Sequence, residues 1–309
     1  MTLNTQWKWR DGLATFYYGG YLVILAGWNP TGGVFTPGPS TNQIWISAND
    51  GLDWTYLGDA PWSARHYSGY QIIGTTFYFF GGEGNKDIWT YDLSQGILNL
   101  AVALNWTEQT SDWGVTGGDY ELFCSWVYNG KIRKAGGQIG FTGTPTMCTD
   151  VQELNTATWT WTNIGTLPIS YASTCLCIQK GAVTWLYGGG RYLDTGHDNF
   201  NNTLKKSLDG GVNWSNVSNL PTDMLGLMYG DGSDFGNKLW FLNGDGGAAN
   251  PGNQTGLWYY EETTDTWIKM PQSPLSKHAS SMCTDGANKM FITSGNTRND
   301  VIRITKTTL

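Results

Sequence analysis

Charged residues are scarce in this chain of 309 residues, and basic ones are the scarcer kind. Asp, Glu, Lys and Arg make up 14% of the sequence, against about 25% in an average protein. The 18 basic residues are scattered, and the formal net charge is −7. Because recognition of a phosphate backbone needs clustered Lys and Arg, we expect no nucleic-acid partner.

Long apolar runs are missing as well. No stretch of the sequence approaches the roughly 18 consecutive apolar residues of a membrane-spanning helix. The residues from Met1 to Gln6 lack the basic segment and the following apolar segment of a signal peptide. We therefore expect no membrane partner and no signal peptide.

Metal-binding patterns are the third absence. The chain has five Cys and three His, and they do not show the spacing of metal ligands. Cys124, Cys175, Cys177 and Cys283 fall in candidate strands, where we interpret them as small buried hydrophobic residues. We expect neither a metal nor another cofactor.

Glycine and tryptophan are what the chain has in excess, with 42 and 17 residues. Turn formers and large aromatic side chains at this density are typical of many short strands joined by tight turns. The length and the absence of a linker favour one large all-β domain over residues 1–309.

An internal repeat defines the expected fold. An apolar run that ends in Gly-Gly, or in a close relative of that pair, recurs six times. The pairs are Ala26-Gly27, Gly81-Gly82, Gly136-Gly137, Gly188-Gly189, Asn243-Gly244 and Ser294-Gly295. Their second glycines lie 55, 55, 52, 55 and 51 residues apart. Six units of this length predict a six-bladed β-propeller of four-stranded antiparallel blades.

Each unit continues in the same order. An apolar pair such as Ile88-Trp89 opens the next strand. Five units then carry a tryptophan in the outer strand: Trp54, Trp106, Trp159, Trp214 and Trp267. Strand, Gly-Gly turn, strand, polar turn and Trp-bearing strand is the order of the kelch repeat, and the chain resembles that family over nearly its whole length. In such a fold large aromatic rings fill the wedges between blades, so we expect Trp89, Trp106, Trp214 and Trp267 to be structural.

Two turns carry a further motif. Ser207-x-Asp209-x-Gly211-x-x-Trp214 resembles the Asp-box of sialidase-type propellers, and Ser47-x-Asn49-x-Gly51-x-x-Trp54 is a degenerate copy. We interpret both as structural turns between strands c and d. The Asp or Asn side chain can accept hydrogen bonds from turn amides, and the Trp anchors the hairpin.

Closure of the ring is less regular. The predicted blades are approximately 10–58, 65–112, 120–165, 172–219, 227–271 and 278–309, the last completed by 2–7. Three residues follow strand c of the last blade, too few for a strand d. We therefore predict that the N-terminal strand completes this blade; the alternative is a three-stranded blade with an exposed edge.

The meander predicts where a ligand would bind. The b–c loops and the d–a crossings share one face, here called face X, and the innermost strands begin there at the mouth of a central channel. Counting 16 residues back from the first residue of each pair gives a ring of Arg10, Arg65, Tyr120, Ala172, Leu227 and His278, and the next positions add Asp11 and His66. The long b–c loops carry Trp28, Arg191, Tyr192, Asp194, His197, Asp198 and Asp245.

The predicted ligand-binding residues are Arg10, Asp11, Trp28, Arg65, His66, Tyr120, Arg191, Tyr192 and His278. Arginine and aromatic residues are the types that dominate binding hot spots. For Arg10 and Arg65 the alternative is that they hydrogen-bond loop carbonyls between the blades. No catalytic residue is predicted.

The sequence favours a non-catalytic binding module whose partner is a protein or a glycan. A sialidase needs three converging arginines and a Tyr–Glu pair, and a copper radical oxidase needs two His and two Tyr ligands; neither set is visible. A sialic-acid mutarotase or epimerase needs only a few polar groups and stays the alternative. The low charge and the Asn-, Thr- and Gly-rich composition resemble phage tail and fibre proteins and surface glycan binders. The location is left open between a virion and the cytoplasm.

Overall fold

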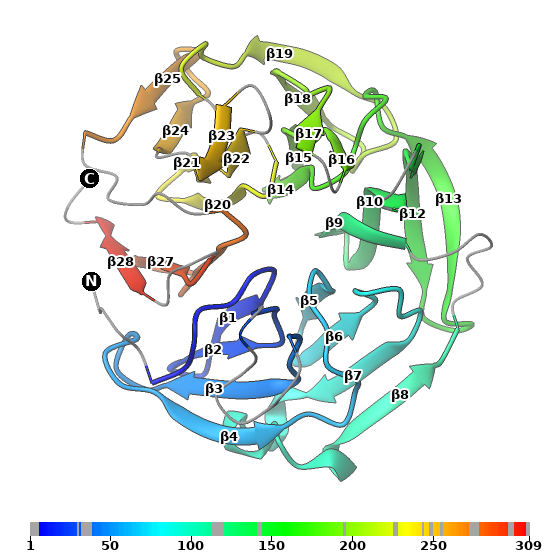
Figure 1. The fold of residues 1–309 in the computed structure, drawn as a ribbon, viewed down its shortest axis with the longest axis vertical. Coiled ribbons are helices and arrows are strands. Elements are labelled where there is room, and N and C mark those ends of the chain that lie inside the picture. Colours follow the sequence, from blue (N-terminus) through cyan, green and yellow to red (C-terminus); the bar gives the residue numbers. More distant parts are fainter. Residues whose placement is uncertain are drawn as a thin grey trace.

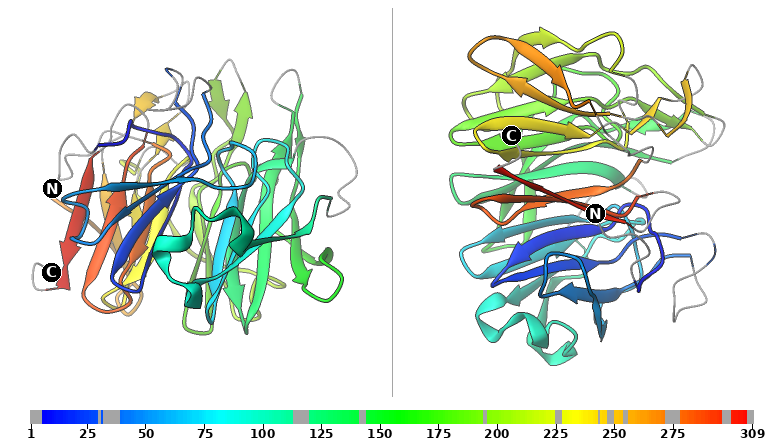
Figure 2. Two further views of the ribbon diagram at one scale, coloured as in Figure 1. Left: turned by 90° about the horizontal axis from the view of Figure 1, so that it is seen from below. Right: turned by 90° about the vertical axis from the view of Figure 1, so that its left-hand side faces the viewer.

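Six antiparallel sheets stand in a ring around a central axis (Figure 1). The structure is a computed structural model that describes residues 6–29, 31, 39–112, 120–140, 144–193, 196–224, 228–242, 244–246, 250–253, 256–271, 278–295 and 300–306. The strands run between the two faces of the ring (Figure 2), and each sheet is one blade. The predicted six-bladed β-propeller is confirmed.

Within each blade the strands pair in chain order from the axis outward. Blade 1 consists of β1 (Ala14–Tyr18), β2 (Tyr21–Leu25), β3 (Gln43–Ser47) and β4 (Thr55–Asp59). Blade 2 consists of β5 (Gly69–Ile73), β6 (Thr76–Phe80), β7 (Ile88–Asp92) and β8 (Trp106–Thr110). Blade 3 consists of β9 (Tyr120–Tyr128), β10 (Lys131–Ile139), β12 (Asp150–Asn155) and β13 (Thr160–Thr166), with β11 (Thr146–Met147) paired to β10.

The second half of the ring repeats this order. Blade 4 consists of β14 (Leu176–Lys180), β15 (Val183–Tyr187), β18 (Thr203–Ser207) and β19 (Ser215–Asn219). Blade 5 consists of β20 (Asp231–Phe235), β21 (Lys238–Leu242), β24 (Leu257–Glu261) and β25 (Thr266–Lys269). Blade 6 has β26 (Ser281–Thr284), β27 (Lys289–Thr293) and β28 (Val301–Thr305). Two small hairpins rise from b–c loops: β16 (Arg191–Leu193) with β17 (Gly196–Asp198), and β22 (Asp245–Gly246) with β23 (Asn250–Asn253).

The glycine pairs turn the chain where strand b leaves the sheet. In the five blades where both residues are described, the first has φ between 51° and 74° and the second between 85° and 123°. The second glycine also lies against the crossing that leads into strand a. A Cβ added at Gly82 would lie 2.5 Å from the carbonyl oxygen of His66. Glycine is required there both for its backbone conformation and for this close approach.

The hydrophobic core is divided among the joints between blades. Among the described residues, six apolar clusters each combine side chains of two neighbouring blades, and a seventh lies at the axis. Trp106 is buried between blades 1 and 2, where it packs edge-on against Trp62 and donates its indole N–H to the carbonyl of Leu100 at 2.7 Å. Trp89, Trp214 and Trp267 pack against three of these clusters. Burial of large rings at the joints is therefore what holds neighbouring blades together.

The Ser-x-Asp-x-Gly-x-x-Trp turn in blade 4 has the hydrogen bonds expected of a structural turn. The Ser207 hydroxyl accepts from the Gly211 amide at 2.7 Å, and the Asp209 carboxylate accepts from the amide of Asn213 at 2.9 Å. The Trp214 indole donates to the Gly211 carbonyl at 2.9 Å. The turn also docks on blade 3, because the Gly210 carbonyl accepts from the Arg133 guanidinium at 2.6 Å.

The corresponding turn in blade 1 docks on blade 6. Its Ser47 hydroxyl accepts from the Gly51 amide at 2.8 Å. The carboxylate of Asp50 accepts from the Lys289 ammonium and from the Arg303 guanidinium, each at 2.8 Å. This turn therefore spans the joint between the first and last blades of the chain.

Closure involves the N-terminal segment, although not through a described strand. Residues 2–5 of the predicted closing strand lie outside the described residues, and Gln6 and Trp7 are not in a strand. The Trp7 ring is buried and packs edge-on against Trp54, with 5.5 Å between the ring centroids. It belongs to the cluster that joins blades 1 and 6. Pairing of the N-terminus with β28 stays a prediction.

Among the residues that the structure describes, helical structure is confined to 3-10 turns. Three of them, Leu93–Gln95, Ile97–Asn99 and Ala103–Asn105, lie between β7 and β8. In the part of the chain that the structure describes, no helix is long and apolar enough to cross a bilayer.

Candidate functional site

A belt of residues with left-handed backbone surrounds the axis near face X. One residue just before or at the start of each innermost strand has φ between 52° and 63°. These residues are Gly12, Tyr67, Leu122, Thr174, Tyr229 and Ala279. Backbone hydrogen bonds link several of them from blade to blade: the amides of Tyr67, Thr174 and Ala279 donate to the carbonyls of Gly12, Leu122 and Tyr229 at 2.7–2.9 Å. Non-glycine residues in this conformation are costly, and such strain is concentrated at functional sites.

Two tyrosines of this belt contact each other and line the channel, and we call this pair the tyrosine floor. The rings of Tyr67 and Tyr229 lie 5.3 Å apart, centroid to centroid. The Tyr67 hydroxyl donates to the Asp11 carboxylate at 2.6 Å. Burial, together with the nearby Asp11 charge, raises the pKa of Tyr67 well above its ordinary value. The phenol therefore keeps its proton and remains a hydrogen-bond donor.

Two histidines and two carboxylates stand over the tyrosine floor. The His278 imidazole lies between the carboxylates of Asp11 and Asp245, with nitrogen–oxygen distances of 3.7 and 3.8 Å. The His197 Nε2 lies 4.0 Å from the same Asp245 oxygen. Both imidazole rings contact the Tyr229 ring, each with 5.5 Å between centroids. Asp11 lies just before β1 and His278 lies in the crossing from β25 to β26, whereas His197 and Asp245 lie between strands b and c of their blades. The starts of innermost strands and the b–c loops therefore meet on face X.

The third histidine joins the same group of rings from the other side. The His66 ring contacts the Tyr67 ring at 4.9 Å, and its Nδ1 lies 3.0 Å from the Glu83 carboxylate. The centroids of the Trp28 and His66 rings lie 6.2 Å apart. Burial opposes ionisation of Glu83, but hydrogen bonds from His66 and Ser40 outweigh it and lower the pKa of this carboxyl. Each of the three histidines of the chain thus contacts a ring of the tyrosine floor, and we call this region of face X the axial mouth.

The two ring arginines are packed inside the blades. Arg10 is 1% exposed and Arg65 is 0% exposed. Arg10 donates to the Ala26 carbonyl at 3.1 Å, and Arg65 donates to the Gly81 carbonyl at 3.1 Å and pairs with Asp87. These are the loop-carbonyl bonds of the alternative interpretation. In this structure neither guanidinium reaches the surface of the mouth, so ligand contact by these two residues is not supported.

The other predicted residues divide into two groups. Asp11, Trp28, His66, Tyr192 and His278 lie at the mouth, where the Tyr192 ring packs at a tilt against His197 with 4.8 Å between centroids. Arg191 instead forms an ion pair with Asp198 in the β16–β17 hairpin at 2.5 Å. Tyr120 begins β9, but its side chain lies outside the described residues, as do Asp194 and Leu227.

Tyr67, Glu83 and Tyr229 were missed by the sequence prediction. In five blades the belt residue lies 14 residues before the first member of the glycine pair, two positions beyond the ring that we counted. The signal was thus present in the repeat. It could not be identified because the left-handed conformation of the belt has no signature in residue type: a glycine, two tyrosines, a leucine, a threonine and an alanine occupy it.

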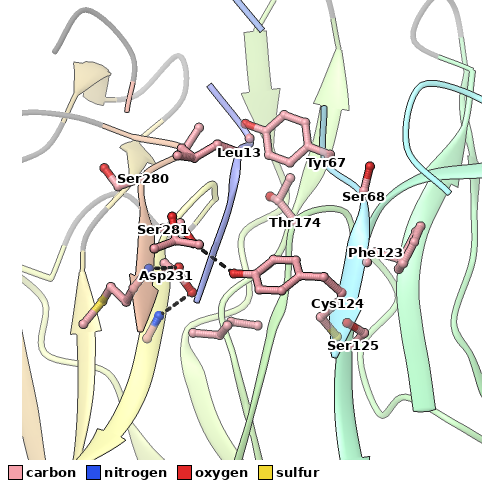
Figure 3. Close-up of a pocket in the computed structure, with 18 of the residues that line it drawn as sticks. Leu13, Tyr67, Ser68, Phe123, Cys124, Ser125, Thr174, Asp231, Ser280 and Ser281 are labelled. Atoms are coloured by element: carbon pink, nitrogen blue, oxygen red, sulfur yellow. Dashed lines mark hydrogen bonds between the residues drawn. The ribbon is translucent and has the colours of Figure 1, made fainter. Parts of the chain in front are cut away.

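Below the tyrosine floor the channel contains a cavity of about 470 Å³ (Figure 3). The innermost strands line it, and its polar side chains include Ser68, Tyr70, Ser125, Asp231 and Ser281. A volume of this size is within the range of small-molecule sites, about 300–1,000 Å³. The molecule therefore has two candidate sites on one axis, the mouth above the tyrosine floor and the cavity below it.

The charges at the mouth bear on the chemistry that it can perform. Its ionisable groups are carboxylates, imidazoles and phenols. Every described arginine donates to protein groups: Arg10, Arg65, Arg133, Arg191 and Arg303. A three-arginine clamp for an anionic sugar is not present among the described residues. Nor do these residues contain a group of three or more His, Cys, Asp or Glu side chains that could hold a metal ion.

Comparison of the chain with protein-family models and with curated proteins gives no match.

Proposed function

We propose that this protein is a binding propeller that holds a neutral or amino sugar of a glycan at the axial mouth. The observation that carries the proposal is the convergence of all three histidines on the tyrosine floor. They arrive from three separate segments of a chain that is otherwise poor in charge.

The chemistry of the mouth suits a sugar. Carboxylates accept hydrogen bonds from sugar hydroxyls, and imidazoles can both donate and accept. Tyr192 and Trp28 present aromatic rings beside these polar groups, and such rings stack on the C–H faces of sugars. The carboxylates of Asp11, Glu83 and Asp245 would repel an anionic sugar. This argues for a neutral or amino sugar over sialic acid.

A glycan array tests the proposal. The combined His197→Ala and His278→Ala variant removes two imidazoles from the mouth without touching the buried joints. We expect it to lose at least about tenfold in apparent affinity, which is about 1.4 kcal/mol. Glu108→Ala, on the outward face of β8, is the matched control and should bind like the wild type. Unchanged binding by the double variant would move the site off the mouth.

A second candidate is proton-transfer chemistry on a sugar, such as mutarotation. The position of His278 between two carboxylates favours it, because an imidazole held in this way can take and return a proton. Proton NMR of a freshly dissolved single anomer distinguishes the two functions. Accelerated equilibration by the wild type that is lost in His278→Ala would establish catalysis. Binding without acceleration would leave the binding module.

We further propose that the repeat is of the kelch type and that the two c–d turns are Asp-boxes. The left-handed glycine pairs after strand b support the first assignment. The Ser–Gly and Asp–Asn hydrogen bonds of the turn at Ser207 support the second.

A further inference from the structure

The cavity below the tyrosine floor has an unbalanced charge. Its described lining holds one carboxyl group, that of Asp231, and no Lys, Arg or His. The other ionisable lining residues are the tyrosines and cysteines, which are ordinarily neutral near pH 7. Ionisation of Asp231 thus leaves a negative charge in the cavity wall without a cation of the lining to balance it.

The hydrogen bonds of Asp231 come from neutral donors. Its carboxylate accepts from the amides of Gly232 and Met282 at 2.7 and 2.5 Å, and the Ser281 hydroxyl is also in hydrogen-bonding contact with it. Asp231 and Ser281 lie side by side in the cavity wall (Figure 3), and the hydroxyl of Tyr70, on β5, lies 2.9 Å from the Ser281 oxygen. Blades 2, 5 and 6 therefore orient this group together. The arrangement fixes the carboxylate in place but does not neutralise it.

We propose that the cavity is a second binding site and takes a small organic ammonium ion, with its charged nitrogen beside Asp231. A bare metal ion would leave most of the 470 Å³ unfilled. Phe16, Tyr70 and Phe123 line the same space, and aromatic faces attract organic cations. The proposal does not depend on sugar binding at the mouth, because Asp231 lines the cavity whereas His197, His278 and Asp245 of the mouth do not.

The protonation state of Asp231 gives the site a pH dependence. Burial raises the pKa of Asp231 to about 7. The titratable groups that face it are Tyr70 on β5 and Cys283 on β26, and burial raises the pKa of each, with Asp231 adding to the rise. Both therefore stay neutral while Asp231 ionises. A cation should bind when the carboxyl is ionised, above pH 7.

Isothermal titration with three near-isosteric probes tests the site: benzylamine, benzyl alcohol and benzoate, at pH 8. We expect benzylamine to bind at least tenfold more tightly than the alcohol and benzoate not to bind. Asp231→Asn should abolish that preference. Asp234→Asn removes a carboxylate from the same strand outside the cavity lining, and should preserve it. Equal binding of amine and alcohol, or an unchanged preference in Asp231→Asn, would overturn the proposal.

The wild type alone provides a second test, which holds even if Asp231→Asn fails to fold. For a group of pKa about 7, the ionised fraction rises about tenfold between pH 6 and pH 8. The affinity for benzylamine, which stays protonated in this range, should rise by the same factor, while that for benzyl alcohol should not change. A flat pH profile for the amine would refute the site. The His197→Ala and His278→Ala variant should leave this binding intact, so failure at the mouth and failure in the cavity are distinguishable.

Discussion

Truncation of Trp7 to alanine tests how the ring is closed. The indole is 1% exposed and packs edge-on against Trp54 in the cluster shared by blades 1 and 6. Burial of an aromatic side chain removes about 200 Å² from water, which at about 25 cal/mol per Å² corresponds to about 5 kcal/mol. Large-to-alanine changes in packed cores cost about 3–5 kcal/mol, so we expect Trp7→Ala to lower the free energy of unfolding by this amount.

Urea unfolding followed by far-UV circular dichroism measures the effect of this change. The matched control is Lys8→Ala, one residue along the same segment, where the side chain is exposed. We expect the control to change the free energy of unfolding by no more than about 0.5 kcal/mol. A loss below about 1 kcal/mol for Trp7→Ala would refute the reasoning. The N-terminal segment would then lie on the ring without holding it closed.

Three further changes probe the turns, the glycine pairs and the cavity. Asp50→Asn removes the charge that pairs with two cations of blade 6, and should cost about 1–2 kcal/mol in low salt and less in 1 M NaCl, measured by urea unfolding. Gly82→Ala should lower the free energy of unfolding by more than about 2 kcal/mol, because φ of Gly82 is +85° and a Cβ would meet the His66 carbonyl oxygen. A melting temperature within about 2 °C of the wild type would contradict this. Burial raises the pKa of Asp231 to about 7, so the folded protein keeps this proton up to a higher pH than the unfolded chain does. The free energy of unfolding should therefore fall by up to about 4 kcal/mol as the pH rises from about 4 to about 7. Asp231→Asn should lack this part of the slope.

The fold could be predicted because its determinants are local and repeated. A pair with left-handed backbone, followed by an apolar strand, marks the same turn in the five blades where both residues of the pair are described. The c–d turn at Ser207 could likewise be predicted from the sequence, because its hydrogen bonds join residues within four positions of one another. What the sequence did not reveal was how the Trp7 ring packs, since Trp54, its ring partner, and the blade 6 residues of the same cluster are distant along the chain.

The mouth was predicted in part. Counting along the repeat located Asp11, His66 and His278 because each lies at a fixed distance from a glycine pair. The same count placed Arg10 and Arg65 beside them, but could not show that a side chain at the mouth can turn back into the blade. Both arginines do so, since carbonyls at the ends of the b strands need donors and each guanidinium can supply several. Counting along the repeat thus gives the position of a residue, but not the direction in which a long side chain points.

The closing joint and the mouth are coupled through the belt. The Gly12 amide donates to the Ala279 carbonyl at 3.2 Å across the joint between blades 1 and 6. Asp11 and His278, the residues immediately before these two, face each other across the same joint at 3.7 Å. The spacing of this carboxylate and this imidazole is therefore fixed by how firmly the ring is closed. Trp7 packs in the cluster that joins the same two blades, so we expect its truncation to alter the geometry of the mouth as well as the stability of the ring.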